Sequence, residues 1–170
     1  RISDPLSKFG ATFQLKNNKN LPLTVYGAKN LKSIKYIEKK GSAQCKSAVI
    51  FGGMRANGTT LIKAKKSRNH TELLCKYLKL PVIVKKKKNF DEIKVNKINK
   101  IKPINYNIPS DISSSAFFIV LTALTKNSKI LIKNVNINPS RTGVLTILKK
   151  MGVKILLKNL KIYKGEKKAD

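Results

Sequence analysis

The residues best suited to binding chemistry lie in the heptapeptide Gly41–Ser47, which opens an apolar run that continues through Phe51. Ser42 is a good helix N-cap, because its hydroxyl can accept a hydrogen bond from the free amides of a first helical turn. A helix start that carries Ser42, Gln44 and Lys46 and has unpaired backbone N–H groups is suited to a phosphate or a carboxylate. The alternative is an ordinary capped helix without a ligand, and both interpretations are open at this point.

Three other polar positions resemble parts of catalytic sites. Arg68 stands near a second predicted helix start, where it could bind a phosphate or pair with Glu72 one turn on. Asp111 shortly precedes a run of serines, and we interpret this pattern as a helix cap rather than as catalytic machinery. His70 is the single histidine of the chain, and we interpret it as a structural, hydrogen-bonded residue rather than a base.

The composition limits the class of protein. The chain has 170 residues, of which 41% are hydrophobic, and this suffices for a core in one domain or in two small ones. No apolar run in the sequence is long enough to span a membrane. Cys45 and Cys75 are too few for a disulfide framework and show no metal-ligand spacing. We therefore expect buried free thiols in a reducing cytosol.

The formal charge of +29 suggests an anionic partner. Only four of the 37 basic residues are arginines, whereas dedicated phosphate-reading surfaces favour the planar fork of Arg. The lysines are also scattered over every segment of the chain. We interpret most of them as a solvated coat, with attraction of small anionic substrates as the second interpretation and nucleic-acid binding as the third.

Hydrophobic periodicity and turn residues predict an alternating α/β chain. Helices are expected at residues 2–9, 42–55, 67–79, 113–125 and 139–150. Strands are expected at residues 11–15, 21–26, 32–37, 59–63, 82–84, 93–95, 104–106, 129–133 and 153–157, the last pairing with 160–163. Polar turns are expected at residues 16–20, 57–58 and 85–88.

This order is an internal repeat of β-α-β-α-β-β units. Leu61–Lys63 recurs as Leu131–Lys133, and Arg68 recurs as Arg141, each time after a serine near a helix start. The period of about 70 residues is too long for a solenoid, so each unit is a compact module. We expect a structural role for Arg141. The chain starts in the last third of one unit and then holds two nearly complete ones, which predicts truncation at the N-terminus.

Four motifs carry a family resemblance, and they occur in family order and at family spacing. They are Gly41–Ala48, Ser67–Glu72, Ile108–Phe118 and Asn138–Gly143. Over essentially all its residues the chain resembles the 3-phosphoshikimate 1-carboxyvinyltransferase family, also called 5-enolpyruvylshikimate-3-phosphate synthases. Four ordered motifs are far more specific than any one short pattern.

The resemblance implies an α/β fold, the inverse α/β barrel of enolpyruvyl transferases. In this fold two lobes are each built of three β-α-β-α-β-β units, with helices inside and sheets outside. The chain would be an internal fragment, truncated at both ends. Residues 1–107 would form part of the first lobe, namely the end of one repeat unit and one full unit. Residues 108–170 would form the first unit of the continuing second lobe.

The reaction implied by the resemblance is transfer of the enolpyruvyl group of phosphoenolpyruvate to the 5-hydroxyl of shikimate 3-phosphate, with release of phosphate. It needs no metal and no organic cofactor. By the same resemblance Ser42 and Ala43 would face the phosphate of shikimate 3-phosphate. Gln44 would hydrogen-bond between the two substrates, and Arg68 would neutralise the phosphate with a planar pair of donors.

The chain also departs from the family pattern. Asn69 and Ser110 stand where relatives often carry Asp and Gly, and we expect both changes to be tolerated. The Lys-Ser, the phosphoenolpyruvate-binding Gly and the Arg-Pro-Met motif would lie before Arg1, and the catalytic Asp and the Lys-Glu pair would lie beyond Asp170. We therefore expect no catalytic residue within this chain and no turnover by the isolated 170 residues.

The expected partners are shikimate 3-phosphate and phosphoenolpyruvate, with no nucleic acid and no membrane. The resemblance further implies a cytoplasmic protein that is a monomer at full length. Two alternatives belong to other classes: a basic nucleic-acid-binding module, and a folded scaffold fragment without activity. Thermal stabilisation by shikimate 3-phosphate would favour the enzyme, whereas DNA affinity that falls steeply with salt would favour the nucleic-acid module.

Overall fold

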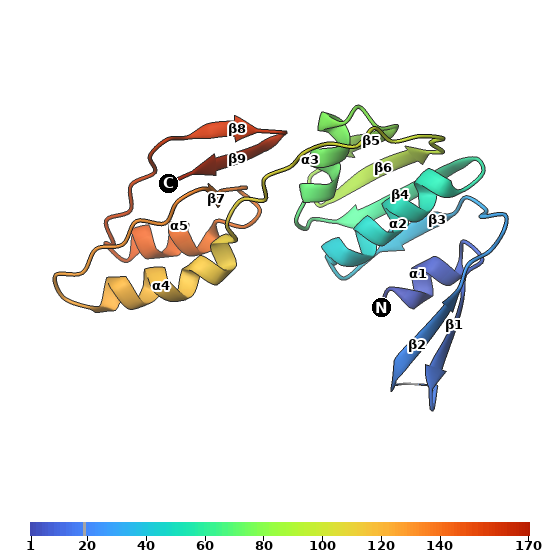
Figure 1. The fold of residues 1–170 in the computed structure, drawn as a ribbon, viewed down its shortest axis with the longest axis horizontal. Coiled ribbons are helices and arrows are strands. Elements are labelled where there is room, and N and C mark those ends of the chain that lie inside the picture. The colour runs from blue at the N-terminus through green and yellow to red at the C-terminus, as the bar shows by residue number, and fades with distance from the viewer. Residues whose placement is uncertain (19) are drawn as a thin grey trace. The chain divides into compact units, whose positions relative to one another are not determined.

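The computed structural model describes residues 1–18 and 20–170, which divide into two compact units. Unit 1 is Arg1–Lys102 and unit 2 is Pro103–Asp170 (Figure 1). The expected crossing from one lobe to the other after residue 107 stays a prediction. The predicted turn at residues 16–20 includes Lys19, which lies outside the described residues.

Unit 1 begins with a short helix and a hairpin. The elements are α1 (Ser3–Ser7), β1 (Thr12–Lys16) and β2 (Asn20–Tyr26). The two strands pair antiparallel as a separate two-stranded sheet. Gly10 follows α1 with a φ of 110°, a left-handed conformation that favours glycine, and so it turns the chain into β1.

The predicted β-α-β-α-β-β order is confirmed in the rest of unit 1. Its elements are β3 (Lys35–Glu38), α2 (Ala43–Arg55), β4 (Thr59–Lys65), α3 (His70–Tyr77), β5 (Val82–Lys86) and β6 (Phe90–Asn96). They form a four-stranded sheet in the order β3-β4-β6-β5, in which only β3 and β4 are parallel (Figure 1). The lysine run was predicted as a turn from residue 85, but Lys85 and Lys86 extend β5, because each pairs with an acidic residue of β6.

The core of unit 1 lies between α2 and the sheet. Thr60, Ile62 and Ala64 alternate with exposed residues along β4 and are at most 2% exposed, as expected for a strand with one covered face. Val49 and Ile50 of α2 are fully buried. A Cβ at Gly53 would lie 2.9 Å from Cβ of Thr60, so the absence of a side chain there lets α2 lie close to β4.

Unit 2 contains α4 (Ile112–Leu124), β7 (Val135–Asn136), α5 (Gly143–Lys150), β8 (Lys161–Tyr163) and β9 (Glu166–Ala169). Its strands form an antiparallel sheet in the order β7-β9-β8. Its small core centres on Ile112, Val135 and Leu145. Both predicted helices are confirmed, with starts at Ile112 and Gly143.

Three predicted strands of unit 2 are absent. Residues 104–106, 129–133 and 153–157 have no strand pairing, and the segment at 160–163 pairs with β9 instead of with 153–157. Asn134 and Asn159 have φ angles of 55° and 52°, and such left-handed residues interrupt an extended ladder where each segment meets the sheet. The β-branched composition of these segments favours strands, but a strand also needs a paired neighbour.

Candidate functional site

The predicted helix start at Ser42 is confirmed. Ser42 has an extended backbone, with φ −87° and ψ 107°, and its Oγ accepts a hydrogen bond of 3.3 Å from the amide of Cys45. The amides of Ala43 and Gln44 belong to the first turn of α2, so no earlier carbonyl of the helix is available to them. The first turn therefore presents donors at the positive end of the helix dipole.

A buried carboxylate fixes the turn that precedes α2. Glu38 ends β3 and is only 4% exposed. Its two carboxylate oxygens accept from the amides of Lys40 and Gly41, at 2.9 Å and 2.7 Å. Gly41 has a φ of 69°, and a Cβ there would lie 3.3 Å from the carbonyl oxygen of Lys66. The start of α2 is thus held close to the chain that follows β4.

Lys46 connects the start of α2 to the segment that carries Arg68. The side chain of Lys46 is fully buried, and its Nζ donates to the carbonyl oxygen of Arg68 at 2.9 Å. The same Nζ lies 2.6 Å from a carboxylate oxygen of Glu72, which is also buried. Nearby, the hydroxyls of Ser47 and Thr71 share a 2.6 Å hydrogen bond.

Lys46 was expected to face a phosphate at this helix start, and its full burial shows that this expectation is wrong. Lys46 precedes the buried Val49 and Ile50 by one helical turn, so it lies on the apolar face of α2. This i, i+3, i+4 spacing was the available signal that Lys46 points into the core. Its role here is to position the Arg68 segment rather than to contact a ligand.

The four predicted binding residues lie on two segments, the start of α2 and the chain around Arg68, which Lys46 joins. We call this place the corner of unit 1. Ser42 and Ala43 are half-buried at the start of α2, and Gln44 and Arg68 are exposed. The alternative ion pair of Arg68 with Glu72 is not formed, because the Glu72 carboxylate faces Lys46. Among the described residues, the Arg68 guanidinium has no carboxylate partner. It is therefore available to an anion.

The serine cluster of unit 2 has a structural explanation. Asp111 caps α4 by accepting from the Ser113 amide at 3.1 Å, and Arg141 donates to the same carboxylate oxygen at 2.7 Å. Arg141 also donates to the Ser113 hydroxyl. The Ser113 amide, aided by the charge of Arg141, lowers the pKa of the Asp111 carboxyl. The predicted cap is confirmed, and Arg141 makes structural contacts with the start of α4 rather than with the start of its own helix, where they were expected.

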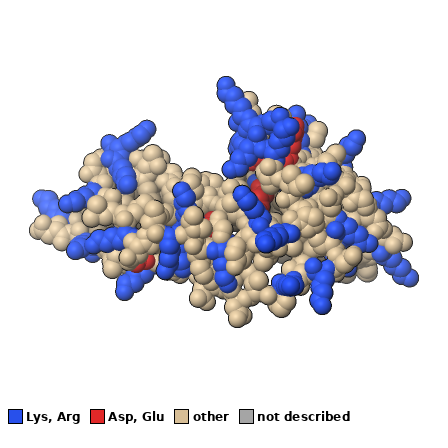
Figure 2. Space-filling model, turned by 90° about the horizontal axis from the view of Figure 1, so that it is seen from above, with Lys and Arg blue, Asp and Glu red and all other residues tan. Residues whose placement is uncertain are grey.

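Metal binding and thiol chemistry find little support in the described part of the chain. Residues 1–18 and 20–170 contain no group of three or more His, Cys, Asp or Glu side chains that could hold a metal ion. Cys45 and Cys75 are free and buried, and burial raises the pKa of the Cys75 thiol to about 11. None of the described helices is long and apolar enough to cross a membrane. Figure 2 shows Lys and Arg spread over the visible face, with few acidic side chains among them.

Comparison with solved structures defines the class of fold. An enolpyruvyl transferase from Streptomyces tendae matches 99% of this chain with a TM-score of 0.58 at 13% identity, which supports the fold alone. An EPSP synthase from Acinetobacter baumannii matches 99% of this chain with a TM-score of 0.79 at 36% identity, and the match covers 37% of that chain. The α/β units described above are therefore those of the enolpyruvyl transferase fold.

Sequence comparison narrows the class to a family. The sequence model of the family described as EPSP synthase (3-phosphoshikimate 1-carboxyvinyltransferase) matches residues 1–168 of this chain. The chain therefore belongs to this family. The 3-phosphoshikimate 1-carboxyvinyltransferases of Caldicellulosiruptor saccharolyticus and Petrotoga mobilis are 42% and 39% identical, over 98% and 100% of this chain. Each match covers 39% of the relative, so the chain spans about two fifths of their length.

Proposed function

We propose that this chain carries part of the shikimate 3-phosphate site of a 3-phosphoshikimate 1-carboxyvinyltransferase. The complete enzyme would transfer the enolpyruvyl group of phosphoenolpyruvate to the 5-hydroxyl of shikimate 3-phosphate. The products would be 5-enolpyruvylshikimate 3-phosphate and phosphate, in the shikimate pathway that leads to chorismate and the aromatic amino acids. Family membership supports this reaction. The proposed site rests on the capped start of α2, which Lys46 connects to the segment that contains Arg68. Among the described residues, the Arg68 guanidinium has no carboxylate partner.

The corner of unit 1 supplies complementary donors for a phosphate dianion. The Ser42 oxygen accepts from the Cys45 amide, which leaves its hydroxyl proton free to be donated to a phosphate oxygen. The amides of Ala43 and Gln44 add neutral donors at the helix start. Arg68 would contribute a charge-assisted fork, the strongest single interaction of the set. Gln44 is exposed at the same helix start, where its amide could reach a second substrate.

The proposal separates binding from chemistry. No residue of this chain is assigned to proton transfer, so the isolated chain would bind shikimate 3-phosphate without converting it. Phosphate release from phosphoenolpyruvate and shikimate 3-phosphate, measured with the isolated chain, tests this point. Turnover above that of a buffer blank would contradict it. We also propose a cytoplasmic protein that is monomeric at full length and needs no cofactor.

Calorimetric titration of the chain with shikimate 3-phosphate tests the binding site directly. Arg68→Ala should weaken binding by about tenfold to a hundredfold, because charged hydrogen bonds contribute about 1.5–3 kcal/mol. Ser42→Ala should weaken it less. Arg55→Ala is the matched control, since Arg55 is an exposed arginine in the last turn of the same helix. Equal loss with Arg55→Ala, or equal affinity for shikimate without phosphate, would contradict a phosphate site at this corner.

The net charge of +29 keeps nucleic-acid binding as a testable alternative. A nonspecific DNA binder loses affinity steeply as salt rises, because binding releases counterions. We expect the chain to show only weak, sequence-independent DNA binding that disappears near physiological salt. Retention of DNA binding at that salt concentration, together with no response to shikimate 3-phosphate, would favour the nucleic-acid module.

A further inference from the structure

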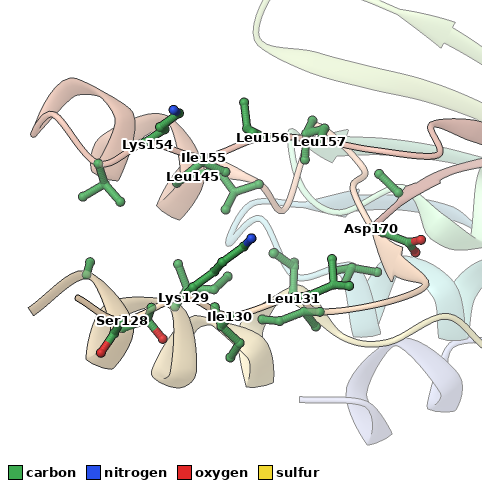
Figure 3. Close-up of a pocket in the computed structure, with 18 of the residues that line it drawn as sticks. Ser128, Lys129, Ile130, Leu131, Leu145, Lys154, Ile155, Leu156, Leu157 and Asp170 are labelled. Atoms are coloured by element: carbon green, nitrogen blue, oxygen red, sulfur yellow. The ribbon is translucent and has the colours of Figure 1, made fainter. Parts of the chain in front are cut away.

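The cavity of unit 2 is less suited to a phosphate than the start of α2. It has a volume of about 580 Å³, and most of the side chains that line it are aliphatic. Figure 3 shows Ile130 and Leu131 on one side of it and Ile155–Leu157 on the other. Such side chains cannot compensate the lost hydration of a dianion. The polar contacts that could support an anion site are therefore found in unit 1.

Two polar contacts join α2 to α3, the helix that follows the Arg68 segment. Nζ of Lys46, in the first turn of α2, lies 2.6 Å from a carboxylate oxygen of Glu72, in the first turn of α3. Beside this ion pair, the hydroxyls of Ser47 and Thr71 share a hydrogen bond of 2.6 Å. The beginnings of the two helices are thus fixed to one another on either side of Arg68.

The ion pair is almost completely buried and poorly compensated. The Lys46 and Glu72 side chains are 1% and 6% exposed. Apart from the ion pair, neither carboxylate oxygen of Glu72 has a hydrogen-bond partner within residues 1–18 and 20–170. Nζ of Lys46 also lies at the start of α3, where the positive end of the helix dipole disfavours a cation. Such a pair stabilises a fold little more than two apolar side chains of the same size would.

A further contact of Lys46 is directed at the proposed anion site. Its Nζ donates to the carbonyl oxygen of Arg68 at 2.9 Å, so it fixes the backbone of that residue. The Arg68 side chain itself is exposed. A long side chain loses rotational freedom when it binds a ligand, and a fixed backbone reduces the freedom that remains to be lost. Lys46 therefore acts on the guanidinium through the backbone, and Glu72 acts by holding Lys46.

We propose that Lys46 and Glu72 are positioning residues of the anion site, and that they contribute more to ligand binding than to the stability of the fold. Lys46 holds the Arg68 backbone, and Glu72 holds the Lys46 ammonium in place. The bond between Ser47 and Thr71 adds a second link between the same two helices. This inference rests on the proposed function, because it needs a phosphate bound at Arg68.

Three variants separate ligand binding from stability. Lys46→Met alone leaves the Glu72 charge buried without a partner, so stability and affinity for shikimate 3-phosphate should both fall. Lys46→Met combined with Glu72→Leu removes both charges, and stability in urea should return close to that of the parent chain. Affinity in calorimetric titration should stay about fivefold or more below that of the parent, because the Arg68 carbonyl has lost its donor. Ile93→Ala is the control: it lowers stability through the core of unit 1 and should leave affinity unchanged.

A measurement without ligand separates failure of this inference from failure of the proposed function. In ¹⁵N relaxation of the double variant, the order parameters of the Arg68 and Asn69 amides should fall, while those of β4 and β6 stay the same. A parent chain that does not bind shikimate 3-phosphate would overturn the proposed function and this inference together.

If the parent chain binds, three results would overturn the positioning role alone. The first is equal affinity of the parent chain and the double variant. The second is an unchanged order parameter at Arg68 in the double variant. The third is a double variant that remains as unstable as Lys46→Met, which would show that the ion pair serves the fold.

Discussion

The two units follow the same repeat, but the hydrophobic cluster of unit 1 is larger than that of unit 2. In unit 1 the central strand β6 pairs with a strand on each side, and ten buried residues form one hydrophobic cluster with α2. In unit 2, among the described residues, the corresponding cluster has only three buried members. Because more side chains are fully buried in unit 1, truncation of a core side chain should cost more there than in unit 2.

The two units also differ in how firmly their helix starts are held in place. The first turn of α2 is fixed by Glu38, by Lys46 and by the packing of Val49 and Ile50 on the sheet. In unit 2, α4 instead exposes a large apolar surface, formed by Phe117, Phe118, Leu121 and Leu124. A helix start supported by a packed sheet can hold its amides in place for an anion, which supports the proposal of a site in unit 1.

The largest expected effect comes from breaking the buried ion pair of unit 1. Lys46→Met would leave the Glu72 carboxylate buried without a cation, and the free energy of unfolding should fall by about 3–5 kcal/mol. Lys66→Met is the control, since Lys66 pairs with Asp91 at 2.7 Å but is 45% exposed. Asp91 is only 9% exposed, but the Lys66 ammonium is open to solvent, so its removal should cost less than that of Lys46. Urea denaturation of both variants checks the difference, and similar losses would contradict the buried role of Lys46.

The next effect compares the cores of the two units. Ile93→Ala removes a side chain that is 1% exposed in the filled centre of unit 1, and it should cost about 2–5 kcal/mol. Ile155→Ala removes a side chain that is only partly buried against the core of unit 2, and it should cost less than about 1.5 kcal/mol. Denaturant unfolding, followed by probes in each unit, gives both values. Equal costs would mean that the two cores are equally closed.

The smallest effect concerns the helix cap of unit 2. The pKa of Asp111 is lowered in the folded chain, chiefly by the Ser113 amide. A lowered carboxyl pKa stabilises the fold above the pKa of the unfolded chain, and this stability is lost as the pH falls through the folded pKa. Asp111→Asn should therefore cost under about 1 kcal/mol at neutral pH, because Asn also caps helices and the pair with Arg141 is exposed. The variant should show a weaker loss of unit 2 stability on acidification; an unchanged pH profile would exclude the cap as its source.

Local rules predicted the starts of α2 and α4 well, but placed those of α3 and α5 a few residues too early. Ser42 and Asp111 cap α2 and α4 because an N-cap depends on one side chain and the next three residues. Strand β4 could likewise be predicted from its own β-branched and apolar alternation, because one covered face is enough to favour a strand there. The contacts of Lys46 with Arg68 and Glu72 join segments more than twenty residues apart, so only its burial could have been predicted from the helix periodicity.

The missing strands of unit 2 show the limit of the same rules. Residues 129–133 and 153–157 have the composition of strands, but pairing depends on a partner elsewhere in the chain. No local pattern indicates whether that partner is present. For the binding corner, motif resemblance selected Ser42, Ala43, Gln44 and Arg68. The structure places Ser42–Gln44 near the Arg68 segment, and contact with a substrate stays a prediction.

The most direct test is an NMR titration of the ¹⁵N-labelled chain with shikimate 3-phosphate. We predict saturable amide shifts at Ala43 and Gln44 and at the Arg68 side chain, with the resonances of unit 2 unchanged. Inorganic phosphate should shift the same signals at much higher concentration, because it lacks the sugar-like ring. Shifts confined to unit 2, or scattered over the lysines of both units without saturation, would contradict a shikimate 3-phosphate site at the start of α2.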